Sequence, residues 1–415
     1  MKRIFTRTLN RIRDIYYEYP RNFWMMIFVN FIDRLGGSLL FPFFALYITK
    51  RFDVGMTEVG KLFAIFFISG FIGSFPGGAL TDRFGRRNII IFSLIATSFS
   101  TLLMGFVNEF QFFLVVAFIS GIFTDVGGPA YEAVFMDVLP EEKRASGFGI
   151  RRVAFNLAVV IGPAIGGFIA ARSYLALFII DAVVSSLVAL LVFLLIPETK
   201  PAAPEGKEQE STVQTFVGYL QVLRDGKFMV FTFVCLLLWF VYMNMNTTLG
   251  VFLRDQYGVP ASGYGWLISI NAAMVVLLQF PITRRLEKNP PMLMMAFGAI
   301  FVAGGLLLYG FVSTYQLFIV AMAILTIGEM ITVPVANALV ASFSPEEMRG
   351  RYNFVYGLSW GISFAAGPYL AGLVMDNYNP NWLWYACGII GTLAILGFAA
   401  LHWNTHAKPI LLTQE

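Results

Sequence analysis

The sequence is poor in the residues that build disulfide frameworks, metal centres and histidine switches. It has two cysteines and two histidines in 415 residues. Cys235 and Cys387 both lie inside apolar runs, which argues against a disulfide framework or a thiolate metal site and favours small apolar packing. His402 and His406 come at the end of the last apolar run, which excludes a buried histidine proton switch. We expect no metal site.

Other absences bear on the class of function. The sequence has no phosphate cradle of the G-x-x-x-x-G-K type, no metal-ligand cluster and no nucleophile elbow, so we expect neither an enzyme nor a cofactor. Its basic residues stand in short loops and form no stripe interleaved with aromatic residues, which argues against nucleic-acid binding. The basic segment 1–21 lacks a cleavage site, so we expect it to be retained and to enforce orientation; a specific lipid or partner site is the alternative.

Apolar residues dominate the amino-acid composition. They make up 58% of the chain, only 13% is charged, and the mean hydropathy is +0.72, which predicts an integral membrane protein. Segments of about 20 apolar residues, the length that crosses a bilayer, are expected to be helical because lipid leaves no other partner for backbone groups. They lie near 22–49, 57–80, 88–107, 110–136, 147–171, 174–196, 227–253, 263–283, 291–311, 314–340, 351–374 and 381–402.

The chain consists of two copies of one unit. Pro140, Glu141, Glu142, Arg144, Gly162, Pro163 and Gly167 recur 205 residues later as Pro345, Glu346, Glu347, Arg349, Gly367, Pro368 and Gly372. The same offset relates Gly60 to Gly265. We therefore predict an all-α membrane protein of two pseudo-symmetric six-helix bundles, residues 1–196 and 227–415, joined by a polar cytoplasmic linker, 197–226.

The placement of lysine and arginine predicts the orientation. If the N terminus is inside, the outer connections hold only Lys50, Arg51, Lys61, Arg172 and Arg254, so both termini should be cytoplasmic in a plasma (inner) membrane. Because each copy has an even number of spans, the halves enter the membrane in the same sense, an arrangement typical of alternating-access carriers with a substrate site between the halves. No dimerisation element is apparent, and we expect a monomer.

The loop after the second span carries a motif. Residues 77–88, GGALTDRFGRRN, resemble the signature G-x-L-A-D-R-x-G-R-R of the major facilitator superfamily, differing at Thr81. The matches are Gly78, Leu80, Asp82, Arg83, Gly85, Arg86 and Arg87. The resemblance implies a latch that closes the inner side, which we assign to Asp82 and Arg86 with Asp137 as their partner. A positive-inside anchor without a gating role is the alternative.

A second motif lies in the fifth span. Gly162, Pro163, Gly166 and Gly167 resemble the glycine–proline signature of the drug/proton antiporter branch of that superfamily. The resemblance implies that this element seals the interface against leak; a small-residue packing groove is the competing interpretation. One feature departs from the branch, because the fourth span lacks the arginine that many antiporters carry there.

Ionisable residues inside the spans are the candidate site, since each costs about 2.5 to 3.5 kcal/mol to insert near mid-membrane. The resemblance implies that the first, fourth, seventh and tenth spans line a central cavity. Those spans supply Asp33, Arg34, Asp125, Glu132, Asn244, Asn246, Glu329 and Asn337. Asp181 lies nearer the outer face in the sixth span, and we expect it to be peripheral.

Two interpretations of these charges stay open. In the first, Arg34 pairs with a carboxylate of the fourth span, while Asp33 or the unpaired carboxylate takes up and releases a proton in competition with substrate. In the second, Arg34 and Asp125 form a buried ion pair that only fixes helix packing. The 43 phenylalanines and 17 methionines suit a hydrophobic ligand, although most must face lipid or neighbouring helices.

The sequence thus predicts a secondary transporter whose partners are a small-molecule substrate, protons and the bilayer. The favoured function is a proton-coupled exporter of amphiphilic, multidrug-type compounds. A carrier of the same fold for a sugar, metabolite or lysolipid, working as an importer or flippase, is the alternative. A ligand-sensing or structural membrane protein that transports nothing remains a third hypothesis.

Overall fold

The computed structural model describes residues 16–140, 143–198, 212–286 and 288–405. For Phe75, Gly78, Ala79, Asp82, Ala145, 212–217, Asn404 and Thr405 it describes the backbone only. Within these ranges the chain is helical without strands, and 12 of its helical segments are long and apolar enough to cross a membrane. The predicted fold class is confirmed.

The first half of the chain supplies six of these spans. They are α2 (Arg21–Leu40) continued by η1 (Phe41–Phe43) and α3 (Phe44–Phe52); α4 (Met56–Phe84); α5 (Arg86–Phe106); α6 (Phe110–Val126) continued by α7 (Gly128–Val138); α8 (Arg144–Arg172); and α9 (Tyr174–Leu195). The two composite spans are the first and the fourth, both of which carry candidate charges.

The second half repeats this arrangement after the short helix α10 (Thr212–Arg224). Its spans are α11 (Gly226–Thr247) continued by α12 (Leu249–Tyr257); α13 (Ala261–Leu286); α14 (Pro291–Leu308); α15 (Tyr315–Phe343); α16 (Arg349–Asn377), preceded by η3 (Glu346–Met348); and α17 (Asn381–Thr405). The seventh span is thus divided at the same place as the first.

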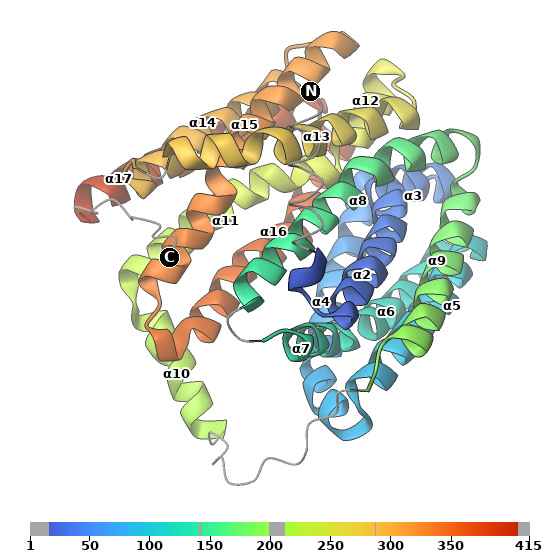
Figure 1. The fold of residues 1–415 in the computed structure, drawn as a ribbon. Helices are drawn as coiled ribbons and strands as arrows, with labels where there is room; N and C mark the ends of the chain where they lie inside the picture. Colours follow the sequence, from blue (N-terminus) through green and yellow to red (C-terminus); the bar gives the residue numbers. More distant parts are fainter. Residues whose placement is uncertain (1–15, 141–142, 199–211, 287, 406–415) are drawn as a thin grey trace, which may run out of the picture.

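The helices form two bundles, blue to green and yellow to red in Figure 1. In the first bundle α2 packs against α8 and α9, and α5 against α6 and α9; in the second, α14 packs against α15 and α17, and α11 against α16 and α17. Two crossing pairs join the bundles, α4 with α16 and α8 with α13. We call the end of the molecule where α9 ends and α10 begins the linker end, and the opposite end the far end.

Glycines bring the crossing pairs into backbone contact at the far end. A Cβ on Gly167 of α8 would lie 2.9 Å from Ser262 Cα of α13, and a Cβ on Gly60 of α4 would lie 2.8 Å from the carbonyl carbon of Pro368 of α16. Side chains at these glycines would push the bundles apart. Since Gly60 and Pro368 are the repeat partners of Gly265 and Pro163, the duplication seen in the sequence produces two equivalent seals.

Two charged side chains add contacts between the bundles at the far end. The Asp376 carboxylate of α16 accepts hydrogen bonds from the backbone N–H groups of Met56 (2.9 Å) and Thr57 (2.7 Å), at the start of α4. Arg254 of α12 donates to the Leu46 carbonyl (3.2 Å) and to Thr49 Oγ1 (3.0 Å) of α3. Both charges have the sign that a helix end attracts, negative at the N terminus and positive at the C terminus.

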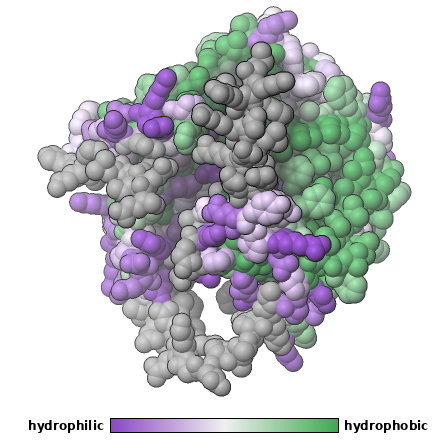
Figure 2. All heavy atoms as spheres, in the orientation of Figure 1, coloured by the Kyte–Doolittle hydropathy of each residue, from purple (hydrophilic) through white to green (hydrophobic). Residues whose placement is uncertain are grey.

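The bundles diverge toward the linker end, at the bottom of Figure 1. There α10 packs against α11 and α16 of the second bundle. Figure 2 shows a broad hydrophobic area over the first bundle, on the right, and hydrophilic side chains gathered toward the bottom, near the linker. The face seen in Figure 2 is therefore apolar over the first bundle, and contacts between the bundles close the far end.

Candidate functional site

Three adjoining cavities lie along α2, and all three share Arg34 and Thr124 as lining residues. One, of about 600 Å³, is lined by Asp33 and two further arginines; we call it the arginine cavity. The second, of about 510 Å³, has walls from both bundles and is called the central cavity. The third, of about 770 Å³, lies against α4 and α16 and is called the phenylalanine cavity.

Arg34 is exposed to the cavities and has no carboxylate partner. Its guanidinium carbon lies 5.3 Å from the centre of the Phe155 ring of α8, and no carboxylate among the described residues is within ion-pair distance. The expected ion pair between Arg34 and Asp125 is therefore absent from this conformation. Asp125 lines two of the same cavities as Arg34 and is close enough for their charges to interact.

Glu132 has a different partner from the one we considered. Its carboxylate pairs with Arg151 of α8 at 2.9 Å, and the Arg151 guanidinium lies 4.8 Å from the rings of Phe135 and Phe148. An arginine held between a carboxylate and two aromatic faces is fixed in place. Glu132 and Asp125 both line the arginine cavity, as their spacing predicts, although the helix is broken at Gly127 between them.

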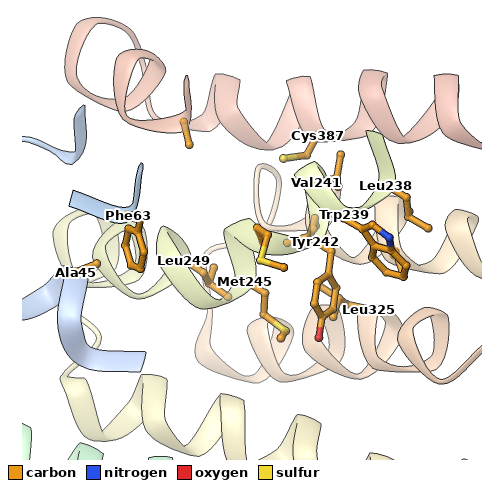
Figure 3. Close-up of a cluster of buried hydrophobic side chains, with 14 of the residues drawn as sticks. Ala45, Phe63, Leu238, Trp239, Val241, Tyr242, Met245, Leu249, Leu325 and Cys387 are labelled. Carbon is orange, nitrogen blue, oxygen red and sulfur yellow. The ribbon is translucent and has the colours of Figure 1, made fainter. Parts of the chain in front are cut away.

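The second bundle contributes one carboxylate to the central cavity. Glu329 of α15 accepts a hydrogen bond from Asn271 Nδ2 at 2.7 Å, and the same nitrogen reaches Thr326 Oγ1 at 2.9 Å. The Tyr242 hydroxyl is in hydrogen-bonding reach of the same carboxylate. Figure 3 shows Tyr242 projecting from the apolar core of this bundle, its hydroxyl pointing away from Cys387. Glu329 is thus held by neutral donors and has no cation beside it.

The two asparagines of the seventh span lie differently. Asn246 lines the central cavity. Asn244 is fully buried inside the second bundle, where its amide donates to the Phe240 carbonyl (3.0 Å) and accepts from Thr248 Oγ1 (3.0 Å). Its amide therefore forms hydrogen bonds at the junction of α11 and α12. The expectation that it faces the cavity was wrong. Asn337 is exposed about two turns beyond Glu329, outside the three cavity walls.

Asp181 is the residue that the sequence analysis misplaced. We expected it at the periphery, but it lines both the central and the phenylalanine cavity, and only 8% of its surface is exposed. A Cβ on Gly36 of α2 would lie 3.3 Å from Asp181 Oδ1, so the missing side chain makes room for the carboxylate. The acidic side chain within the span and the glycine at position 36 were the available signals.

Aromatic rings form the rest of the wall. The phenylalanine cavity is lined by Phe41, Phe44, Phe63, Phe66, Phe67, Phe71, Phe354 and Phe364, which come from α2 to α4 and from α16. Phe41 and Phe364 stack across the bundles with ring centres 6.1 Å apart. The site therefore combines carboxylates and arginines with a flat apolar surface.

The loop of the first motif ties helices of the first bundle together. Arg86 pairs with Asp137 at the end of α7, as the sequence analysis proposed, and donates to the Ala133 carbonyl at 3.3 Å. Gly85 adopts φ +93°, which favours glycine, and the Glu198 carboxylate accepts from the Arg86 backbone N–H at 2.8 Å.

The other members of this motif contribute less to the described contacts. The guanidinium carbons of Arg83 and Arg87 lie 5.3 Å and 5.4 Å from the rings of Phe84 and Phe193. The surroundings of Gly78 and the side chain of Asp82 lie outside the described part of the chain. A gating role for this loop stays a prediction.

The glycine–proline motif of α8 packs on two helices. A Cβ on Gly162 would lie 2.7 Å from Ser38 Cβ, and one on Gly166 would lie 2.8 Å from Phe43 Cε2, both in the first span. Gly167 instead contacts α13 of the other bundle, and Pro163 lines the central cavity. The motif is therefore both a packing groove and part of the seal between the bundles.

Comparison with known families agrees with this architecture. The model of the Major Facilitator Superfamily matches residues 26–367, with a second match at 242–414. The chain belongs to the major facilitator superfamily. It is accordingly a membrane transporter, and its twelve spans and two bundles are the architecture of that superfamily.

Several superfamily members resemble the chain along almost its full length. A Na(+), Li(+), K(+)/H(+) antiporter of Planococcus maritimus is 27% identical, covering 94% of this chain and 97% of its own. The multidrug resistance protein MdtH of Shigella boydii is 26% identical, covering 93% of this chain and 94% of its own.

Solved structures of the superfamily share the fold at low identity. The nucleoside transporter NupG has a TM-score of 0.77 and 13% identity, covering 92% of this chain and 99% of its own. A bacterial homologue of the human lysosomal transporter Spinster, in an inward-facing and occupied conformation, has a TM-score of 0.75 and 14% identity, covering 92% and 96%.

Proposed function

We propose that this superfamily member is a proton-coupled antiporter that exports amphiphilic, preferentially cationic compounds. The observation that carries the proposal is the composition of the site: carboxylates outnumber arginine around α2, while eight phenylalanines line the adjoining wall. A flat apolar ion with a positive charge satisfies both surfaces, because rings stack on its body and a carboxylate balances its charge. The multidrug resistance relative has a name consistent with such a cargo.

The direction of export follows from the orientation we propose. Lys and Arg concentrate at the linker end, which supports a cytoplasmic location for that end, the linker 197–226 and both termini. The arginine cavity reaches Glu132 of α7 and Arg151 of α8, and we propose that a compound enters from the cytoplasm or the inner leaflet. Rocking of the bundles 1–196 and 227–415 about the site would open the far end and close the linker end.

Coupling would arise from competition at the carboxylates. Asp33 lines two cavities beside Arg34, and Asp125 lines two as well. A carboxylate that binds either a proton or the cationic cargo, but not both, links the two fluxes. The pair of Arg86 with Asp137, together with Asp82, would stabilise one arrangement of the linker end, and the glycine–proline motif of α8 would keep the interface tight.

A second cargo is an alkali cation. The relative from Planococcus maritimus is named as an antiporter of such ions, and Thr97, Thr124 and Asp181 all line the central cavity with side-chain oxygens. Oxygen ligands of this kind suit hard cations. Among the described residues, no group of three His, Cys, Asp or Glu is placed to hold a metal ion, so hydroxyls or water would complete the coordination.

Inside-out vesicles test the proposal directly. With a pH gradient imposed, acid inside, we expect addition of tetraphenylphosphonium to the cytoplasmic face to release protons from vesicles that contain the protein and not from empty vesicles. Proton release by sodium or potassium alone would favour the second cargo. Movement of a sugar or lysolipid without any proton flux would contradict proton-coupled export, and no response to any of them would contradict transport by this site.

A further inference from the structure

Asp181 is a buried carboxylate that the scheme above does not use. It lies in α9, which packs against α2 and α5, and its side chain reaches both the central and the phenylalanine cavity. Gly36, three residues after Asp33 on α2, lies directly against Asp181 Oδ1. Because residues three apart share a helix face, Asp33 and Asp181 approach the same space from two helices.

The surroundings of Asp181 hold fewer positive charges than carboxylates. The Thr101 hydroxyl of α5 lies near its carboxylate, and no cation among the described residues lies within ion-pair distance. The ionisable groups that line the same cavities are Asp33, Arg34, Asp125, Glu329 and the Tyr242 hydroxyl. Arg34, the single cation of this set, lies over the Phe155 ring. Four carboxylates thus share one guanidinium.

Helix packing at this place does not depend on Asp181. Ser98 of α5 donates to the Ala182 carbonyl of α9 at 2.7 Å and lies 2.8 Å from Ser186 Oγ, so serine hydroxyls already join the two helices. A buried carboxylate that completes no ion pair, between helices that serine hydroxyls already join, is costly to keep for structure alone.

We propose that Asp181 is a coupling residue that shares one exchangeable proton with Asp33. Two carboxylates in a poorly solvated space beside one cation cannot both carry a charge at low cost, so one of them is a neutral acid. When cationic cargo enters, the acid releases its proton to cavity water and the carboxylate balances the cargo. After the cargo leaves, a proton from water on that side restores the acid. This proposal rests on proton-coupled export.

Asp181→Asn tests the proposal in proteoliposomes with tetraphenylphosphonium as the probe. We expect transport driven by a pH gradient to fall about tenfold or more, while exchange of labelled for unlabelled probe without a gradient persists and becomes independent of pH. The parent protein serves as the reference and Asp53→Asn, an exposed aspartate at the end of α3, as the matched control.

The double variant Asp33→Asn, Asp181→Asn separates coupling from structure. Groups that share one proton act as a unit, so the double variant should lie within about twofold of the single ones, whereas independent structural defects would multiply. Gradient-driven transport by Asp181→Asn at the parent rate would overturn the proposal, as would multiplied defects.

If Asp181→Asn does not reach the membrane, an altered pH dependence of exchange in Asp181→Glu supports the proposal and an unaltered one overturns it. A parent protein that moves no protons would instead contradict the proposed function.

Discussion

Asp33→Asn is expected to remove proton-driven transport while leaving the site able to bind tetraphenylphosphonium. Asp33 stands at the meeting point of the arginine and central cavities, so an amide there keeps the shape but carries no exchangeable proton. We expect the gradient-driven rate to fall by about 10- to 100-fold and the dissociation constant of the probe to change less than about threefold. Uptake in proteoliposomes and equilibrium binding in detergent measure the two quantities.

The same Asp53→Asn variant controls for the loss of an aspartate, because Asp53 is exposed and lies outside the site. If Asp33→Asn transports at the parent rate under a proton gradient, Asp33 has no part in coupling. If probe binding is lost to the same degree as transport, Asp33 serves as a binding group alone.

Asp376→Ala is expected to shift the protein toward a conformation that is open at the far end. Asp376 holds the first turn of α4 from the other bundle, and its repeat counterpart is Ala171, so no second contact of this kind compensates. Two hydrogen bonds to a charged acceptor, partly screened by solvent, stabilise the closed far end by about 1 to 2 kcal/mol, a factor of about 5 to 30 in population. Distances between spin labels at Glu109 and Tyr378, one exposed residue on each bundle, measure the shift.

Asn377→Ala is the matched control for this experiment. Asn377 is the next residue of α16, but its amide donates to Leu373 of its own helix. Its removal should leave the distance distribution unchanged. An unchanged distribution in Asp376→Ala itself would mean that the glycine contacts alone close the far end.

The sequence was sufficient to predict the fold because its strongest signals are repeated. The offset of 205 residues relates Gly60 to Gly265 and Gly167 to Gly372, and the structure uses both pairs in equivalent contacts between the bundles. Span lengths and the lipid requirement for internal hydrogen bonds then leave helix as the one available element. The pairing of Arg86 with Asp137 was predicted from the motif loop and is present.

The site was less predictable because an apolar helix does not reveal which side faces its partner. Asn244 and Asn246 are two residues apart, yet their side chains lie in different places. The Asn244 amide accepts a hydrogen bond from Thr248 at the break between α11 and α12, whereas Asn246 lines the central cavity. Asp181 looked peripheral when judged by depth along its span, since only packing against Gly36 brings its carboxylate toward α2. Arg34 lies over the Phe155 ring, whereas we expected it to pair with a carboxylate of the fourth span.

Access of water-soluble reagents to Thr124, which lines all three cavities, tests the alternating exposure of this site most directly. Cys235 and Cys387 are buried, so a cysteine introduced at Thr124 gives a clean signal with a membrane-impermeant maleimide. We predict that this cysteine is labelled from the cytoplasmic side at rest and from the outer side as well during transport. When a disulfide joins Thr57→Cys to Asp376→Cys, we predict that labelling from the outer side is lost and that labelling from the cytoplasmic side persists. Equal labelling from both sides at once, or from neither, would contradict a cavity that opens to one side at a time.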